Sequence, residues 1–132
     1  MLRPITTLAM LAALTLPVLA DEQPPFTELS ACRLDAERIV LSYAFDGGAC
    51  QEVTEISAGE PRGTIAVVTI ATHNTSEMCT MQIVTVEGSA VLDLSEPVID
   101  LDVTALRPDN TVQAYGLIEA TEDGECTEPA AE

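Results

Sequence analysis

The chain has 132 residues, and its 22 acidic side chains against 5 basic ones give a formal net charge of −17. All five basic residues are arginines. Phosphate groups are bound by a basic face, so this composition argues against nucleic acid as a partner and disfavours anionic lipid. The length suits one domain.

The first twenty residues predict a cleaved export signal. Arg3 is their only charged residue, and the apolar run from Ile5 to Leu19 leads to small residues that end at Ala20. The run is shorter than the roughly 20 residues that span a bilayer. We therefore expect residues 1–20 to be removed and the mature chain to be periplasmic or secreted, without membrane insertion. Removal takes the formal net charge to −18, because the segment holds one arginine and no carboxylate.

Export places four cysteines in an oxidising compartment, so two disulfides are expected. They are Cys32, Cys50, Cys79 and Cys126. If the strands alternate in direction, Cys50 and Cys79 meet at one end of the domain and the other two beyond the opposite end, which favours those pairs. The stretch 29–32 has the form of a lipobox, but charged residues and prolines separate it from the apolar run, so a disulfide is favoured over a lipid anchor.

We interpret residues 21–31 as an acidic N-terminal tail, 32–126 as a single β domain and 127–132 as an acidic C-terminal tail. Within the domain, apolar residues recur at every second position, which is typical of strands. The predicted strands span 38–45, 50–57, 64–72, 79–87, 98–106 and 111–120, and 90–94 fits a seventh short one. The poorly patterned 50–57 is expected at an edge. The run 64–72 is apolar on both faces, which predicts a central strand covered on both sides.

The clearest register lies between 98 and 106. Ile99, Leu101, Val103 and Ala105 face one way, and Asp100, Asp102 and Thr104 face the other. Pro108 then takes the second position of a type I turn, so the next strand is expected to return as the antiparallel partner.

Six to seven short strands and two disulfides predict an all-β fold, an antiparallel β-sandwich of immunoglobulin-like type. A small β-barrel is the alternative. The chain has no tryptophan, so the resemblance is to an architecture only, and architecture does not specify function.

One candidate metal site stands out. His73, Met78 and Met81 surround Cys79 in a His-x₄-Met-Cys-x-Met pattern, and imidazole and thioether are ligands that Cu(I) accepts. The competing interpretation is that Met81 fills the core from a strand and that Cys79 is consumed by a disulfide. We expect no catalytic residues, metal or cofactor, because no Gly-x-Ser-x-Gly elbow precedes a serine and the aspartates fit a solvated face.

The sequence therefore predicts a small exported, disulfide-stabilised, strongly acidic binding or accessory module of the bacterial envelope, monomeric and not an enzyme. The alternative is a periplasmic copper or small-ligand carrier that uses His73, Met78 and Met81. The charge favours a protein partner with a basic face, met through an exposed strand edge or the loops at one end. A surface that is acidic only for solubility is the simpler explanation of the charge itself.

Overall fold

The computed structural model of the protein describes residues 24–122 and 126–129. The expected signal, residues 1–20, lies outside these ranges. Seven strands are present in them: β1 (Glu28–Asp35), β2 (Arg38–Gly48), β3 (Gln51–Ala58), β4 (Ile65–Asn74), β5 (Ile83–Asp93), β6 (Asp100–Leu106) and β7 (Val112–Thr121). They form one sheet in the order β3-β4-β6-β7-β1-β2-β5.

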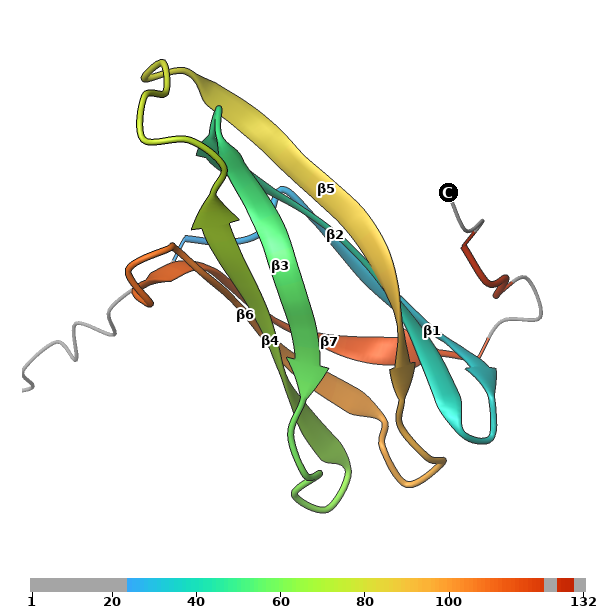
Figure 1. Ribbon diagram of the computed structural model, residues 1–132. Coiled ribbons are helices and arrows are strands. Elements are labelled where there is room, and N and C mark those ends of the chain that lie inside the picture. Colours follow the sequence, from blue (N-terminus) through green and yellow to red (C-terminus); the bar gives the residue numbers. More distant parts are fainter. Residues whose placement is uncertain (1–23, 123–125, 130–132) are drawn as a thin grey trace, which may run out of the picture.

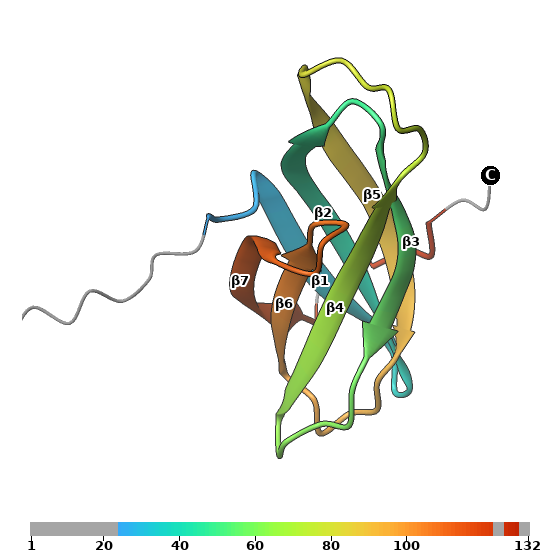
Figure 2. The ribbon, with the colours of Figure 1, turned by 60° about the vertical axis from the view of Figure 1, so that its left-hand side comes forward.

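This sheet curls on itself until its two end strands, β3 and β5, approach each other (Figures 1 and 2). The fold is all-β with two disulfides, as expected, and its shape is close to the small barrel that was the alternative to a sandwich. Two neighbouring pairs, β1 with β7 and β4 with β6, are parallel, so the sheet is mixed and not antiparallel throughout. Successive strands alternate in direction, and strands two or six places apart in the chain therefore run the same way.

The core fills the inside of this curled sheet. Alternate residues of β2, β4 and β6 point inward, and the largest buried side chains are Ile39, Leu41, Phe45, Val68, Ile70, Leu101 and Val103. The predicted register is confirmed within β6, because Leu101, Val103 and Ala105 are fully buried while Asp100 and Asp102 remain partly exposed. It is wrong for Ile99, which lies before the strand and is 47% exposed, while Val98 is buried in its place. The turn after β6 is also as expected: Asn110 N donates to Arg107 O at 2.8 Å, and β7 returns antiparallel to β6.

The prediction that residues 64–72 are covered on both faces is wrong. Ala66, Val68 and Ile70 of β4 are fully buried, whereas Ile65 and Val67 are each 38% exposed. The strand has neighbours on both edges, but a barrel has one interior, so its second face meets solvent. β-branched residues on that face reflect strand propensity and not burial.

β5 differs most from its predicted bounds. Residues 79–82 lie outside it, and the strand continues through Gly88 to absorb the separate 90–94 strand. Gly88 stays within the strand because Tyr43 of β2 fills the space where a side chain would be. A Cβ at Gly88 would lie 2.6 Å from the Tyr43 hydroxyl oxygen.

β1 begins at Glu28, inside the segment interpreted as an acidic tail. It pairs with β2 along its length and buries Ala31, and Phe26 before it packs edge-to-face on Phe45 at 5.9 Å between ring centroids. Glu28 and Asp35 at its ends are exposed, and their charges make the apolar positions of this strand hard to recognise in the sequence. The N-terminal part of the described chain is therefore anchored to the core.

Both disulfides have the favoured pairing. Cys50–Cys79 joins the β2–β3 turn to the β4–β5 loop, and Cys32–Cys126 joins β1 to the segment after β7. β1 and β7 are paired at only two positions, one of them Cys32 with Thr121, so this second bridge reinforces the shortest junction of the sheet. The two disulfides indicate an oxidising, exported location. No helix in the described residues is long and apolar enough to cross a membrane.

Candidate functional site

A polar network closes the barrel near the turn between β2 and β3. Gln51 is the first residue of β3 and points inward, where its Nε2 donates to Thr72 Oγ1 at 2.8 Å and its Oε1 accepts from Gly48 N at 3.0 Å. Gln51 and Gln113 are also hydrogen-bonded to each other, and Gln113 Nε2 donates to Asp46 O at 2.8 Å. The network ties β2, β3, β4 and β7 together. An inward glutamine also explains why residues 50–57 pattern poorly as a strand.

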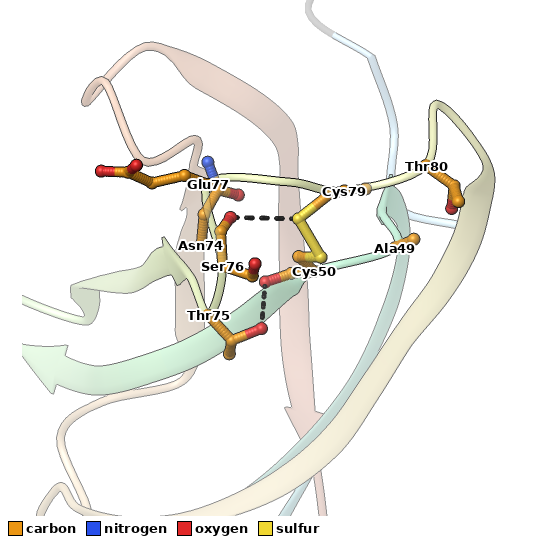
Figure 3. Close-up of a pocket in the computed structure, with 9 residues that line it drawn as sticks. Ala49, Cys50, Asn74, Thr75, Ser76, Glu77, Cys79 and Thr80 are labelled. Carbon is orange, nitrogen blue, oxygen red and sulfur yellow. Dashed lines mark hydrogen bonds between the residues drawn. A yellow bond between two sulfur atoms is a disulfide. The ribbon is translucent and has the colours of Figure 1, made fainter.

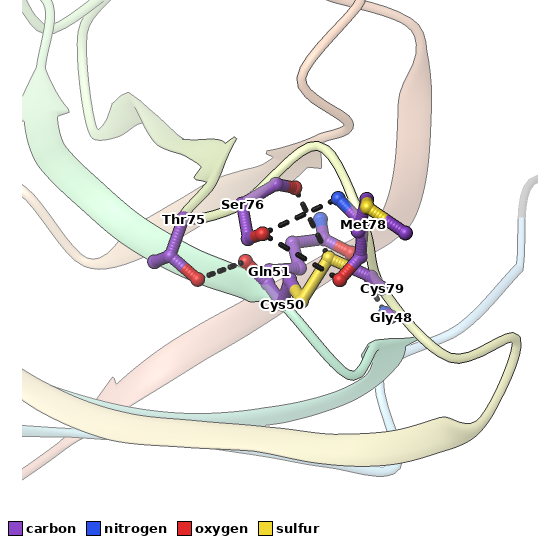
Figure 4. The surroundings of a disulfide bond; sticks show 7 residues. All are labelled: Gly48, Cys50, Gln51, Thr75, Ser76, Met78 and Cys79. Atoms are coloured by element: carbon purple, nitrogen blue, oxygen red, sulfur yellow. Dashed lines mark hydrogen bonds between the residues drawn. A yellow bond between two sulfur atoms is a disulfide. The ribbon is translucent and has the colours of Figure 1, made fainter.

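The Cys50–Cys79 disulfide lies beside this network and borders a surface hollow (Figures 3 and 4). Thr75 holds the β4–β5 loop to the β2–β3 turn, because its N and Oγ1 both donate to Cys50 O, at 2.8 and 3.2 Å. Ser76 O lies 3.1 Å from Cys79 Sγ, but a disulfide sulfur carries no proton, so this is a contact and not a hydrogen bond. The hollow is lined by short polar side chains with one carboxylate, Glu77. The disulfide fixes the loop that borders it.

The structure leaves all three candidate copper ligands exposed to solvent. His73 is exposed near the end of β4, opposite Glu52 of β3. Met78 and Met81 lie in the β4–β5 loop with 92% and 102% of their surface exposed, so their thioethers contact almost nothing. The expectation that Met81 fills the core from a strand is wrong for the same reason. No cluster of three or more His, Cys, Asp or Glu suited to a metal occurs within 24–122 and 126–129.

The outer face of β6 carries Asp100 and Asp102 between apolar side chains of its neighbours. Across the strands, Asp102 is in register with Val67 of β4 and Leu117 of β7. Desolvation and the nearby carboxylate of Asp102 raise the pKa of Tyr115. A phenol beside a carboxylate on an open face stays neutral and offers no nucleophile.

β3 and β5 are the two end strands of the sheet. We call the region between their free edges the β3–β5 seam. Neither strand has a hydrogen-bonded neighbour on that side. Their inward apolar residues pack on the core but remain half-buried: Val53 and Ile56 from β3, Val86 and Ala90 from β5. The corresponding residues of β2, β4 and β6 are buried. Sequence reasoning placed 50–57 at an edge, which is confirmed, but could not pair that edge with β5.

The arginines of the described chain are used mainly inside the fold. Arg33 donates only to backbone carbonyls, those of Asp35, Leu94, Ser95 and Val98. Arg107 donates to Val112 O at 2.6 Å. Arg38 forms the ion pairs seen in the described chain, with Asp35 at 2.6 Å and Glu128 at 3.9 Å, and its hydrogen bond lowers the pKa of Asp35.

Comparisons with protein-family models, with curated proteins and with solved structures found no match to this chain.

Proposed function

We propose that this protein is an exported, disulfide-stabilised, non-catalytic binding or accessory module of the bacterial envelope, and that its partner is a protein with a basic face. The proposal rests on which groups the arginine side chains bind. Two arginines bind backbone carbonyls and a third pairs with Asp35 and Glu128, so most of the acidic side chains in the described residues are exposed without a cationic partner there.

A surface of this kind attracts a basic partner and accelerates its encounter. The competing explanation is an acidity that serves solubility alone. The two differ in salt response, because steering weakens as the Debye length falls from about 30 Å at 0.01 M salt to about 8 Å at 0.15 M. A partner held by charge is therefore captured much better at the lower salt concentration.

The test uses the mature domain immobilised with both disulfides intact and exposed to envelope proteins at the two salt concentrations. An unrelated folded protein of similar net charge serves as the control for simple ion exchange. We expect a basic protein that binds this domain, binds the control poorly, and is retained less at 0.15 M. Binding of neutral or acidic proteins only, or equal capture by the control, would overturn the proposal.

The location within the exported space is part of the same proposal. We propose that residues 1–20 are removed, that Asp21 begins the mature chain, and that the protein is a monomer in the periplasm or the medium. The intact mass of the exported protein should correspond to residues 21–132 less four hydrogens for the two disulfides. A diacylglyceryl mass on an N-terminal Cys32 would contradict it and establish a lipoprotein.

A further inference from the structure

The β3–β5 seam offers two unpaired strand edges that run in the same direction. β5 is 11 residues long, pairs with β2 without a register shift, and contains no proline or lysine. Natural edge strands are usually protected by such residues, by bulges or by a cover. β3 has one such device, a register shift between Val53 and Glu55. The free edge of β5 has none of these within the strand, so it can accept another strand.

The side chains along the seam alternate in character. Val86 and Ala90 of β5, like Val53 and Ile56 of β3, are half-buried and pack against the core. An extended segment paired with the free edge of β5 would add a strand to the sheet, and its own inward side chains would add to the cover of this part of the core. Because strand side chains alternate, every second residue of that segment would have to be apolar.

The charged side chains on the outward face of the seam are all acidic. Glu52 and Glu55 project from β3, and Glu87 and Asp93 from β5, all exposed. Glu87 is also in register with Ala44 and Glu28 across β2 and β1, so two carboxylates flank a small residue beside a surface hollow. Ala44 is itself buried, so a long basic side chain at this edge would reach the carboxylates that border the hollow and not the residue between them.

We propose that the free edge of β5 is the docking site, and that it binds an extended segment of a partner protein in which apolar and basic residues alternate. This inference rests on the proposed function and specifies the surface and the kind of partner. Main-chain hydrogen bonds to β5 would supply affinity, and the alternating side chains specificity. A second copy of this chain is disfavoured, because it would set one strongly acidic edge against another.

The test measures binding of two labelled ten-residue peptides by fluorescence anisotropy at 0.01 M and 0.15 M salt. One alternates valine and arginine, and the other has the same composition in two blocks. The seam variant is Glu55→Lys with Glu87→Lys, and the matched control is Glu77→Lys with Glu119→Lys, all exposed positions with the same change in net charge. Unchanged thermal melting confirms that both variants are folded.

We expect the parent protein to bind the alternating peptide at least tenfold more tightly than the block peptide. The seam variant should lose at least tenfold of that affinity and the control variant less than threefold. Equal losses in both variants, or equal binding of both peptides, would overturn the seam while leaving the basic partner in place. Failure of every basic peptide to bind at either salt concentration would contradict both proposals. A concentration-dependent dimer of the parent protein would assign the edge to a second copy and overturn the assignment made here.

Discussion

Replacing Cys32 and Cys126 with alanine will destabilise this protein more than replacing Cys50 and Cys79. The residues of the two bridges are separated by 94 and 29 positions. In the chain-entropy model, loops of these lengths restrict the unfolded chain by about 4.7 and about 3.6 kcal/mol. The longer loop should therefore contribute about 1 kcal/mol more to the free energy of unfolding.

The folded structure reduces both values by a similar amount. Cys32 is paired with Thr121, five positions before Cys126, and Gln51 beside Cys50 is paired with Asn74, five positions before Cys79. Even without its bridge, the folded chain keeps each partner close, and closing a five-residue loop accounts for about 2 kcal/mol. The net losses are then about 2.6 and about 1.6 kcal/mol.

Urea unfolding of the two double variants measures this difference. With a slope of about 1.5 kcal/mol per molar urea for a domain of this size, the midpoint of the Cys32/Cys126 variant should lie about 0.7 M below that of the other. The parent protein with both bridges is the reference. Equal midpoints, or the reverse order, would refute the reasoning that loop length, corrected for the tether, sets the contribution of each bridge.

Three further changes test the packing and the charges. Gly88→Ala should lower the free energy of unfolding by about 1 to 3 kcal/mol, because the added Cβ overlaps the Tyr43 hydroxyl. Adding Tyr43→Phe should relieve much of this loss. A double-mutant cycle that shows no coupling between the two positions would be inconsistent with the contact. Gln51→Leu should lower the free energy of unfolding by about 1 to 3 kcal/mol, because its partners in the buried network lose their hydrogen bonds. A loss of less than about 0.5 kcal/mol in a urea titration would count against the network. Because Arg38 lowers the pKa of Asp35, the stability from this pair is present above the ordinary carboxyl value of 3.8 and is lost as the pH falls through the lowered one. In Arg38→Gln the Asp35 carboxyl should titrate at higher pH by NMR, and an unchanged midpoint would remove Arg38 as the cause.

The strands that could be predicted from sequence are those with one apolar and one polar face. β6 shows this best, because burying Leu101 and Val103 requires Asp102 to face outward, and no other register satisfies both. The cysteine pairing followed from the same alternation of strand direction. These features depend on local pattern and on chain reversal alone.

The features that sequence reasoning missed depend on contacts distant in the chain. Gly88 ends a strand in many settings, but here Tyr43 fills the space beside it and β5 continues. Gln51 looks unsuitable for a strand until Thr72 and Gln113 provide its hydrogen-bond partners. The seam could not be located in advance because it depends on the order of strands in the sheet, which sets β3 and β5 at its two ends.

Amide hydrogen exchange along β5 reports whether the free edge of this strand binds the partner segment. The mature protein is compared alone and with the alternating valine-arginine peptide at saturating concentration in 0.01 M salt. The account predicts slower exchange for alternate residues of β5, between Ile83 and Asp93, whose amides point away from β2 toward the seam. Protection confined to the loops, or to the outer face of β6 and β7, with β5 unchanged, would contradict it.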